Sequence, residues 1–244
     1  MKSIVNKRHY TDNTQLYLSS AYRMMREIPK LSKNIVKSSY YYQNIISSCV
    51  NSFIALESYI NKYHYELFIN ADSGYYNVKT PRAIMEYFRG NWKRISIRDK
   101  YILIAAIIAD YEFDTKKKPF VLFDEFIKFR NLLIHPPMLE IISKIEITNI
   151  DEILSGGIVI EEYVNKKKPK KLFPHTKFSE RPDKLTITDA EKAFEISYRM
   201  IMDIYNISDK THPLILHYSE NGKDIIYKIG ESIIELINPH FGKL

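Results

Sequence analysis

The sequence predicts an all-α protein, a bundle of helices with two small β excursions. Apolar residues recur at intervals of three or four in several long stretches, and this spacing places them on one face of a helix. Several of these stretches begin with side chains that cap helix N-termini. With 244 residues and 45% hydrophobic residues, the chain is long enough to bury a core without disulfides or metals.

Two helices are expected in the N-terminal third. Asp12 to Gln15 has capping-box spacing, and apolar residues then follow at helical intervals until Pro29 ends the run. A much longer amphipathic helix comes next. Its apolar stripe consists of Ile46, Val50, Phe53, Leu56, Ile60, Tyr63 and Leu67. Cys49 lies inside this stripe, which indicates a small core residue.

The middle of the chain predicts three more helices. Thr80 to Gly90 has an N-cap, an early proline and a terminal glycine, the pattern of a short helix. Trp92 is expected to anchor the core. Asp99 to Asp110 is apolar nearly all round, which predicts the most central helix of the bundle. Pro119 is well placed to begin the next helix, which carries the most unusual residues of the chain.

The β excursions are expected after that helix and near the C-terminus. Residues 145–164 are dense in β-branched side chains and contain Gly156-Gly157, which suggests two short strands. Near the end, Asn221-Gly222 separates two apolar runs, a signal for a hairpin. Between the excursions, the basic run 166–171 is expected to be a solvated loop.

A closing helix is expected from Thr188 to Tyr205. Thr188 and Glu191 have capping-box spacing.

Charge and composition restrict the function classes. The net charge of +7 and a pI of about 9.1 give a slight weight towards a nucleic-acid partner such as RNA. The single Cys49 excludes an intrachain disulfide, and no spacing of Cys or His suggests a metal site or a cofactor. The longest apolar run, 101–109, is too short to cross a bilayer, so we expect no membrane partner and a cytoplasmic protein.

The helix after Pro119 breaks the expected pattern of a buried helix at Arg130. One strip of this helix holds Phe123, Ile127, Arg130 and Ile134. A permanent charge therefore lies in an otherwise apolar strip. Asn131 and His135 lie on another strip, and Pro136 makes His135 the expected last residue of the helix. An Arg, an amide and an imidazole thus gather within about one and a half turns.

The segment Arg130 to His135 resembles the Arg-x4-6-His signature of the HEPN superfamily, with the Asn that often follows the Arg. Ala55 to Asn61 is similar to the "ALE…IN" helix of that family, and Thr188 to Glu191 is similar to the start of its closing helix. The resemblance covers about residues 33–206 and implies an antiparallel helical bundle.

The resemblance also sets the expected domain organisation. Residues 1–210 would form the HEPN-like domain, with a basic loop insertion at 145–187. Residues 211–244 would form a C-terminal appendage packed on the same domain.

HEPN ribonucleases cut RNA without a metal, and the resemblance implies this activity in a dimer. His135 would be the general base, Arg130 would stabilise charge on phosphorus, and Asn131 would bind a phosphate oxygen. Glu57 and Asn61 would support Arg130, Glu57 through a bidentate ion pair, although a solvated Glu57 is an equal alternative. The competing function is a catalytically silent HEPN scaffold that dimerises and binds RNA or a protein.

Arg130 and His135 lie about 140° apart around their helix, so one copy cannot easily direct both at one phosphate. A homodimer with these helices at its two-fold axis would form a composite site. The implied context is a toxin or phage-defence system, in which an antitoxin or another defence-operon protein would be the partner. Pro137 stands where toxins controlled by nucleotidyltransferase antitoxins carry a modified Tyr, so that form of control is not expected.

Overall fold

The computed structural model confirms the all-α class. It describes residues 13–28, 39–69, 81–135, 141–146, 158–163, 173–179, 184–208, 215–220 and 223–228. The helices are α1 (Thr14–Glu27), α2 (Ser39–His64), α3 (Arg82–Asn91), α4 (Ile97–Ala109), α5 (Phe120–Ile134) and α7 (Ile187–Ile207). A π-helical turn, η3 (Tyr65–Ile69), extends α2, and a 3-10 turn, η5 (Trp92–Arg94), follows α3.

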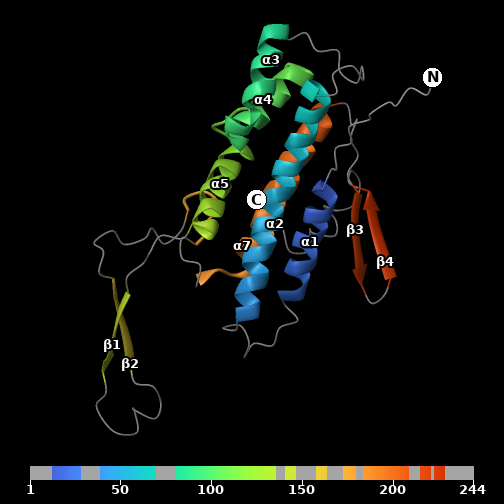
Figure 1. Cartoon of the computed structure of the whole chain (residues 1–244). Helices are drawn as coiled ribbons and strands as arrows, with labels where there is room; N and C mark the ends of the chain where they lie inside the picture. The colour runs from blue at the N-terminus through green and yellow to red at the C-terminus, as the bar shows by residue number, and fades with distance from the viewer. Residues whose placement is uncertain are drawn as a thin grey trace, which may run out of the picture.

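Helices α2 and α7 form the centre of the bundle, and each contacts α1, α4 and α5 as well as the other (Figure 1). Their large side chains, including Tyr59, Tyr63 and Phe194, are fully buried. Cys49 is also fully buried, as its place in the stripe of α2 predicted, and burial raises the pKa of its thiol far above the ordinary value. Trp92 is buried, which confirms its predicted role as a core anchor.

The prediction that residues 99–110 form the most central helix is wrong. Helix α4 buries only Tyr101, Ile104 and Ala105, whereas α7 buries twelve residues. The other apolar side chains of α4 are half-buried or exposed. An all-round apolar composition does not specify which helix is enclosed, because that depends on how many neighbours pack against it.

Local signals placed the helix ends within a few residues. Helix α1 ends at Glu27, just before Pro29, and α5 begins directly after Pro119. The capping box of the closing helix was predicted two residues too late. Thr186 is the N-cap, and it exchanges hydrogen bonds with Asp189, the third residue of α7. Two overlapping Thr-x-x-acid patterns exist here, and the first one is used.

Both predicted β excursions are present as antiparallel hairpins, although the first begins four residues before the predicted range 145–164. Strands β1 (Ile141–Glu146) and β2 (Ile158–Tyr163) pair with Ile141 opposite Tyr163. Strands β3 (Ile215–Glu220) and β4 (Lys223–Lys228) pair with Ile215 opposite Lys228. Figure 1 shows β1–β2 beyond the C-terminal end of α5, away from the bundle, and β3 beside α1. The basic run 166–171 lies outside the described residues.

A buried carboxylate in α5 holds a distant segment on the bundle. Glu125 is 6% exposed and accepts backbone N–H hydrogen bonds from His175, at 3.1 Å to each oxygen, and from Thr176, at 2.7 Å. The Thr176 hydroxyl donates to the same carboxylate at 2.8 Å. Phe178 then stacks on Phe129 with ring centroids 4.1 Å apart. The segment 173–179 therefore covers the inner face of α5.

None of the described helices combines the length and the apolar character that a membrane span requires.

Candidate functional site

The motif residues lie together at the C-terminal end of α5. The helix ends at Ile134, one residue before the predicted last position, and His135 is its C-cap. The backbone N–H of His135 donates to the carbonyl of Asn131 at 2.8 Å, which completes the last turn. The side chains of Asn131 and His135 are exposed. An amide and an imidazole are therefore accessible at one helix end.

Arg130 lies between the core and this exposed end. Its guanidinium carbon is 4.9 Å from the centre of the Phe53 ring, a cation–π contact with α2. Its Nη1 donates to Oδ1 of Asn131 at 3.2 Å. Its Nε is buried and has no hydrogen-bond partner in the described part of the chain. Among the described residues, neither Arg130 nor His135 takes part in an ion pair, so the charge of Arg130 remains unneutralised by these residues.

The strip that contains Arg130 is less buried than its composition predicted. Phe123 is fully buried, but Ile127 is half-buried and Ile134 is 38% exposed. The residues of this strip become more exposed towards the C-terminal end of α5, so apolar side chains lie near the surface on both sides of Arg130. An exposed isoleucine one turn beyond Arg130 gives this end of the helix apolar surface beside its polar groups.

Glu57 and Asn61 are not placed to support Arg130. No ion pair joins Glu57 to Arg130, although the structure describes both residues; the charge of Glu57 acts on Lys100 and Tyr101 of α4 instead. Phe53, one turn before Glu57, occupies the position next to the guanidinium. The residue of α2 that contacts Arg130 is therefore aromatic and lies one turn before the predicted Glu57.

Asn61 has a structural role at the other end of α2. Its Oδ1 accepts from Nε1 of Trp92 at 2.7 Å and from Nζ of Lys100 at 3.4 Å. The Lys100 ammonium also lies 4.9 Å from the Trp92 ring, and His64 stacks on the same ring. Burial, followed by the nearby Lys100 charge, lowers the pKa of His64 to about 4. This cluster joins α2 to α4. Arg130 is not part of it.

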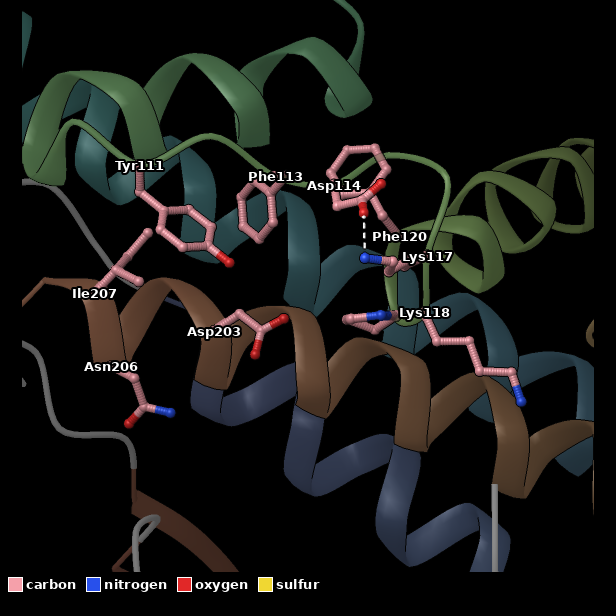
Figure 2. Close-up of a pocket in the computed structure, with 10 residues that line it drawn as sticks. Tyr111, Phe113, Asp114, Lys117, Lys118, Phe120, Asp203, Asn206 and Ile207 are labelled. Atoms are coloured by element: carbon pink, nitrogen blue, oxygen red, sulfur yellow. Dashed lines mark ion pairs between the residues drawn. The ribbon is translucent and has the colours of Figure 1, made fainter.

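A cavity of about 290 Å³ lies at the opposite end of α5, and sequence patterns did not predict it. It is formed by the loop between α4 and α5, the start of α5 and the last turns of α7 (Figure 2). The aromatic rings of Tyr111, Phe113 and Phe120 line one side, and Asp203 and Asn206 of α7 contribute polar groups on the other. No motif marks these residues, since they come from segments about ninety positions apart.

The carboxylate of Asp203 is the unusual group in this cavity. Burial raises its pKa from 3.8 to about 6, and the nearby Arg199 offsets only part of that effect. Asp203 makes no hydrogen bond or ion pair with any residue that the structure describes. Arg199 is instead paired with Glu195 one turn earlier on α7. Asp203 is thus a half-buried carboxylate that accepts no hydrogen bond from the residues that the structure describes.

Comparisons with protein families, curated proteins and solved structures found no match. Within the described ranges, no group of three or more His, Cys, Asp or Glu side chains is arranged to hold a metal ion.

Proposed function

We propose that this protein is a metal-independent endoribonuclease of the HEPN type that acts as a dimer. The observation that carries the proposal is the joint position of Arg130, Asn131 and His135 at one exposed helix end, with Arg130 and His135 in no ion pair with the described residues. The HEPN-like motif supplies the reaction class. The net charge of +7 is consistent with an RNA substrate.

Each side chain has a role that fits its chemistry. A neutral His135 imidazole takes the proton from a ribose 2′-hydroxyl, a contribution of roughly 10²–10⁴-fold to the rate. The 2′-oxygen then attacks the adjacent phosphorus, and the 5′-oxygen of the next nucleotide leaves. Arg130 stabilises the negative charge on the phosphoryl oxygens, and Asn131 donates a hydrogen bond to one of them. The hydrogen bond between Arg130 and Asn131 orients both groups before RNA binds.

A second copy of the chain completes the site. An ideal helix separates positions 130 and 135 by about 140°, so residues from two opposed helices reach one phosphate more easily than residues from one. Ile134, with 38% of its surface exposed, offers apolar contact area for such a pairing. A cytoplasmic setting in toxin or phage defence, with a partner from the same operon, belongs to this proposal as its biological context.

Cleavage of single-stranded RNA in excess chelator tests the activity. We expect a product that ends in a 2′,3′-cyclic phosphate, because the attacking oxygen is the neighbouring 2′-hydroxyl. His135→Ala should reduce cleavage by about 10²-fold or more, with helical content and dimer mass unchanged, because the side chain is exposed. RNA with a 2′-deoxy substitution at the cut site should remain intact.

His175→Ala is the matched control, because His175 is also an exposed histidine near α5 and its backbone N–H, rather than its ring, contacts Glu125. Cleavage that needs magnesium or survives His135→Ala would contradict the mechanism. RNA binding without cleavage by the unmodified protein would instead indicate a scaffold. A monomer at micromolar concentration in sedimentation would exclude the composite site.

A further inference from the structure

The cavity between the α4–α5 loop and α7 has the composition of a site for a small organic cation. Its rings form a continuous wall: Tyr111 meets Phe113 edge to face at 5.1 Å, and Phe113 contacts Phe120 at 5.3 Å. Aromatic faces attract cations, and the attraction increases when the cation is shielded from water. Figure 2 shows Asp203 on α7, on the side of the cavity opposite Tyr111 and Phe113.

The balance of charge in the lining favours a positive ligand over a negative one. Lys117 is neutralised by Asp114, whose carboxylate lies 3.0 Å from its ammonium group. Lys118 extends along α7 away from Asp203 (Figure 2), and its charge acts on Glu195. Of the two carboxylates in the lining, Asp114 and Asp203, only Asp203 has no ion-pair partner among the described residues. A bound anion would face this carboxylate, whereas a bound cation would neutralise it.

Hydrogen-bonding capacity narrows the ligand to an amine that carries N–H donors. A primary ammonium group has three donors. The two oxygens of Asp203 can accept two of them, and the Tyr111 hydroxyl, which Figure 2 shows on the side of the cavity facing Asp203, can accept another. Neither residue uses these acceptors for another residue in the described part of the chain. Burial raises the pKa of Asp203, and no hydrogen-bond donor among the described residues offsets that effect.

The size of the cavity limits the rest of the ligand. Its volume of about 290 Å³ lies at the lower limit of about 300–1,000 Å³ for pockets that bind small molecules. A short alkyl chain can lie against Phe113, Phe120 and Ile207, all of which line the space. We propose that this cavity binds a small linear amine, with its ammonium group on Asp203 and its alkyl chain along the aromatic wall.

Calorimetric titration of the full chain with n-butylamine tests the proposal, with 1-butanol as the uncharged probe of the same length. We expect saturable binding of n-butylamine at constant ionic strength and no binding of 1-butanol. Asp203→Asn keeps the size of the side chain but removes its charge, so the affinity for n-butylamine should fall about tenfold or more. Tyr111→Ala should also weaken binding, and this variant should fold normally because Tyr111 is 44% exposed.

Asp110→Asn is the matched control, because it removes one carboxylate from the same loop at a residue that does not line the cavity. Asp110 adopts a left-handed backbone conformation with φ of 50°, which asparagine also tolerates. The affinity of the Asp110→Asn variant for n-butylamine should equal that of the unmodified protein. Three results would overturn the proposal: no saturable binding, equal binding by Asp203→Asn, or an equal loss in Asp110→Asn. The titration is independent of RNA cleavage, so failure of the ribonuclease proposal would not change its outcome.

Discussion

The middle and the C-terminal end of α5 use polar side chains in opposite ways. Glu125, in the middle, is almost fully buried and accepts four hydrogen bonds from His175 and Thr176. Arg130, little more than one turn later, has a buried Nε with no partner and a guanidinium that reaches the exposed end. Both are charged groups on one helix, yet only the first is satisfied within the described part of the chain.

This difference separates groups that hold the fold from groups that are available for chemistry. The hydrogen bonds to Glu125 use its carboxylate to fix the segment 173–179 on α5. Arg130 contributes one hydrogen bond and one cation–π contact, so most of its hydrogen-bonding capacity is free to act on a phosphate. Asp203 belongs to the second kind, because its carboxylate is half-buried and unused. The free energy of unfolding should therefore respond very differently to substitutions at these positions.

Glu125→Ala should cause the largest loss of stability, about 3–4 kcal/mol, because it leaves two backbone N–H groups and a hydroxyl without their acceptor. Chemical denaturation measures the loss. Asp124→Ala is the control on the same helix, since Asp124 is a half-exposed partner of Arg98, and it should cost less than about 1 kcal/mol. Equal losses in the two variants would show that the hydrogen bonds to Glu125 contribute no more to stability than the ion pair of Asp124.

Asp203→Asn should increase stability at neutral pH. Because the folded-state pKa is raised from 3.8 to about 6, the unmodified protein loses stability as the pH rises through that interval, by at most about 3 kcal/mol. Asparagine cannot ionise, so its advantage should be absent below pH 3.8, grow up to pH 6 and remain constant above it. Denaturation midpoints across this range, without amines, measure the effect. A constant difference at all pH values would mean that ionisation of Asp203 is not the cause.

Arg130→Ala should lower stability by only about 1 kcal/mol, the scale of one cation–π contact at a partly exposed site. If the proposed ribonuclease activity is present, the same variant should lose far more in cleavage rate, about 10²-fold or more. Thermal unfolding and RNA cleavage by one preparation compare the two effects. A large loss of stability with little loss of activity would show that Arg130, like Glu125, stabilises the fold and does not act on RNA.

Glu57→Ala should have the smallest effect, less than about 1 kcal/mol. From the sequence alone, an ion pair with buried Arg130 would have made this loss about 3–5 kcal/mol. In the structure Glu57 is half-buried and forms no ion pair with any described residue, so little is lost. Urea denaturation measures the difference. A loss above 3 kcal/mol would indicate that Glu57 forms the predicted ion pair with Arg130.

The sequence alone determined the helices, the two hairpins and the place of the motif at a helix end. These features depend on interactions between near neighbours: apolar periodicity defines α2, Pro119 and Pro136 bracket α5, and Asn221-Gly222 separates β3 from β4. The register of the closing helix was missed by two residues, because two similar capping patterns overlap there. Local chemistry could not decide between them without the hydrogen bonds that Thr186 makes.

Only the tertiary structure decided which polar groups are satisfied. Glu125 finds its donors 50 residues away, Asn61 binds Trp92 rather than Arg130, and Asp203 faces a loop about ninety positions earlier in the chain. Helical periodicity assigns a residue to a face of its own helix, but the neighbour of that face is set by how distant segments pack. The physical reason is that burial and hydrogen-bond satisfaction depend on contacts between elements, whereas helix formation depends mainly on contacts within them.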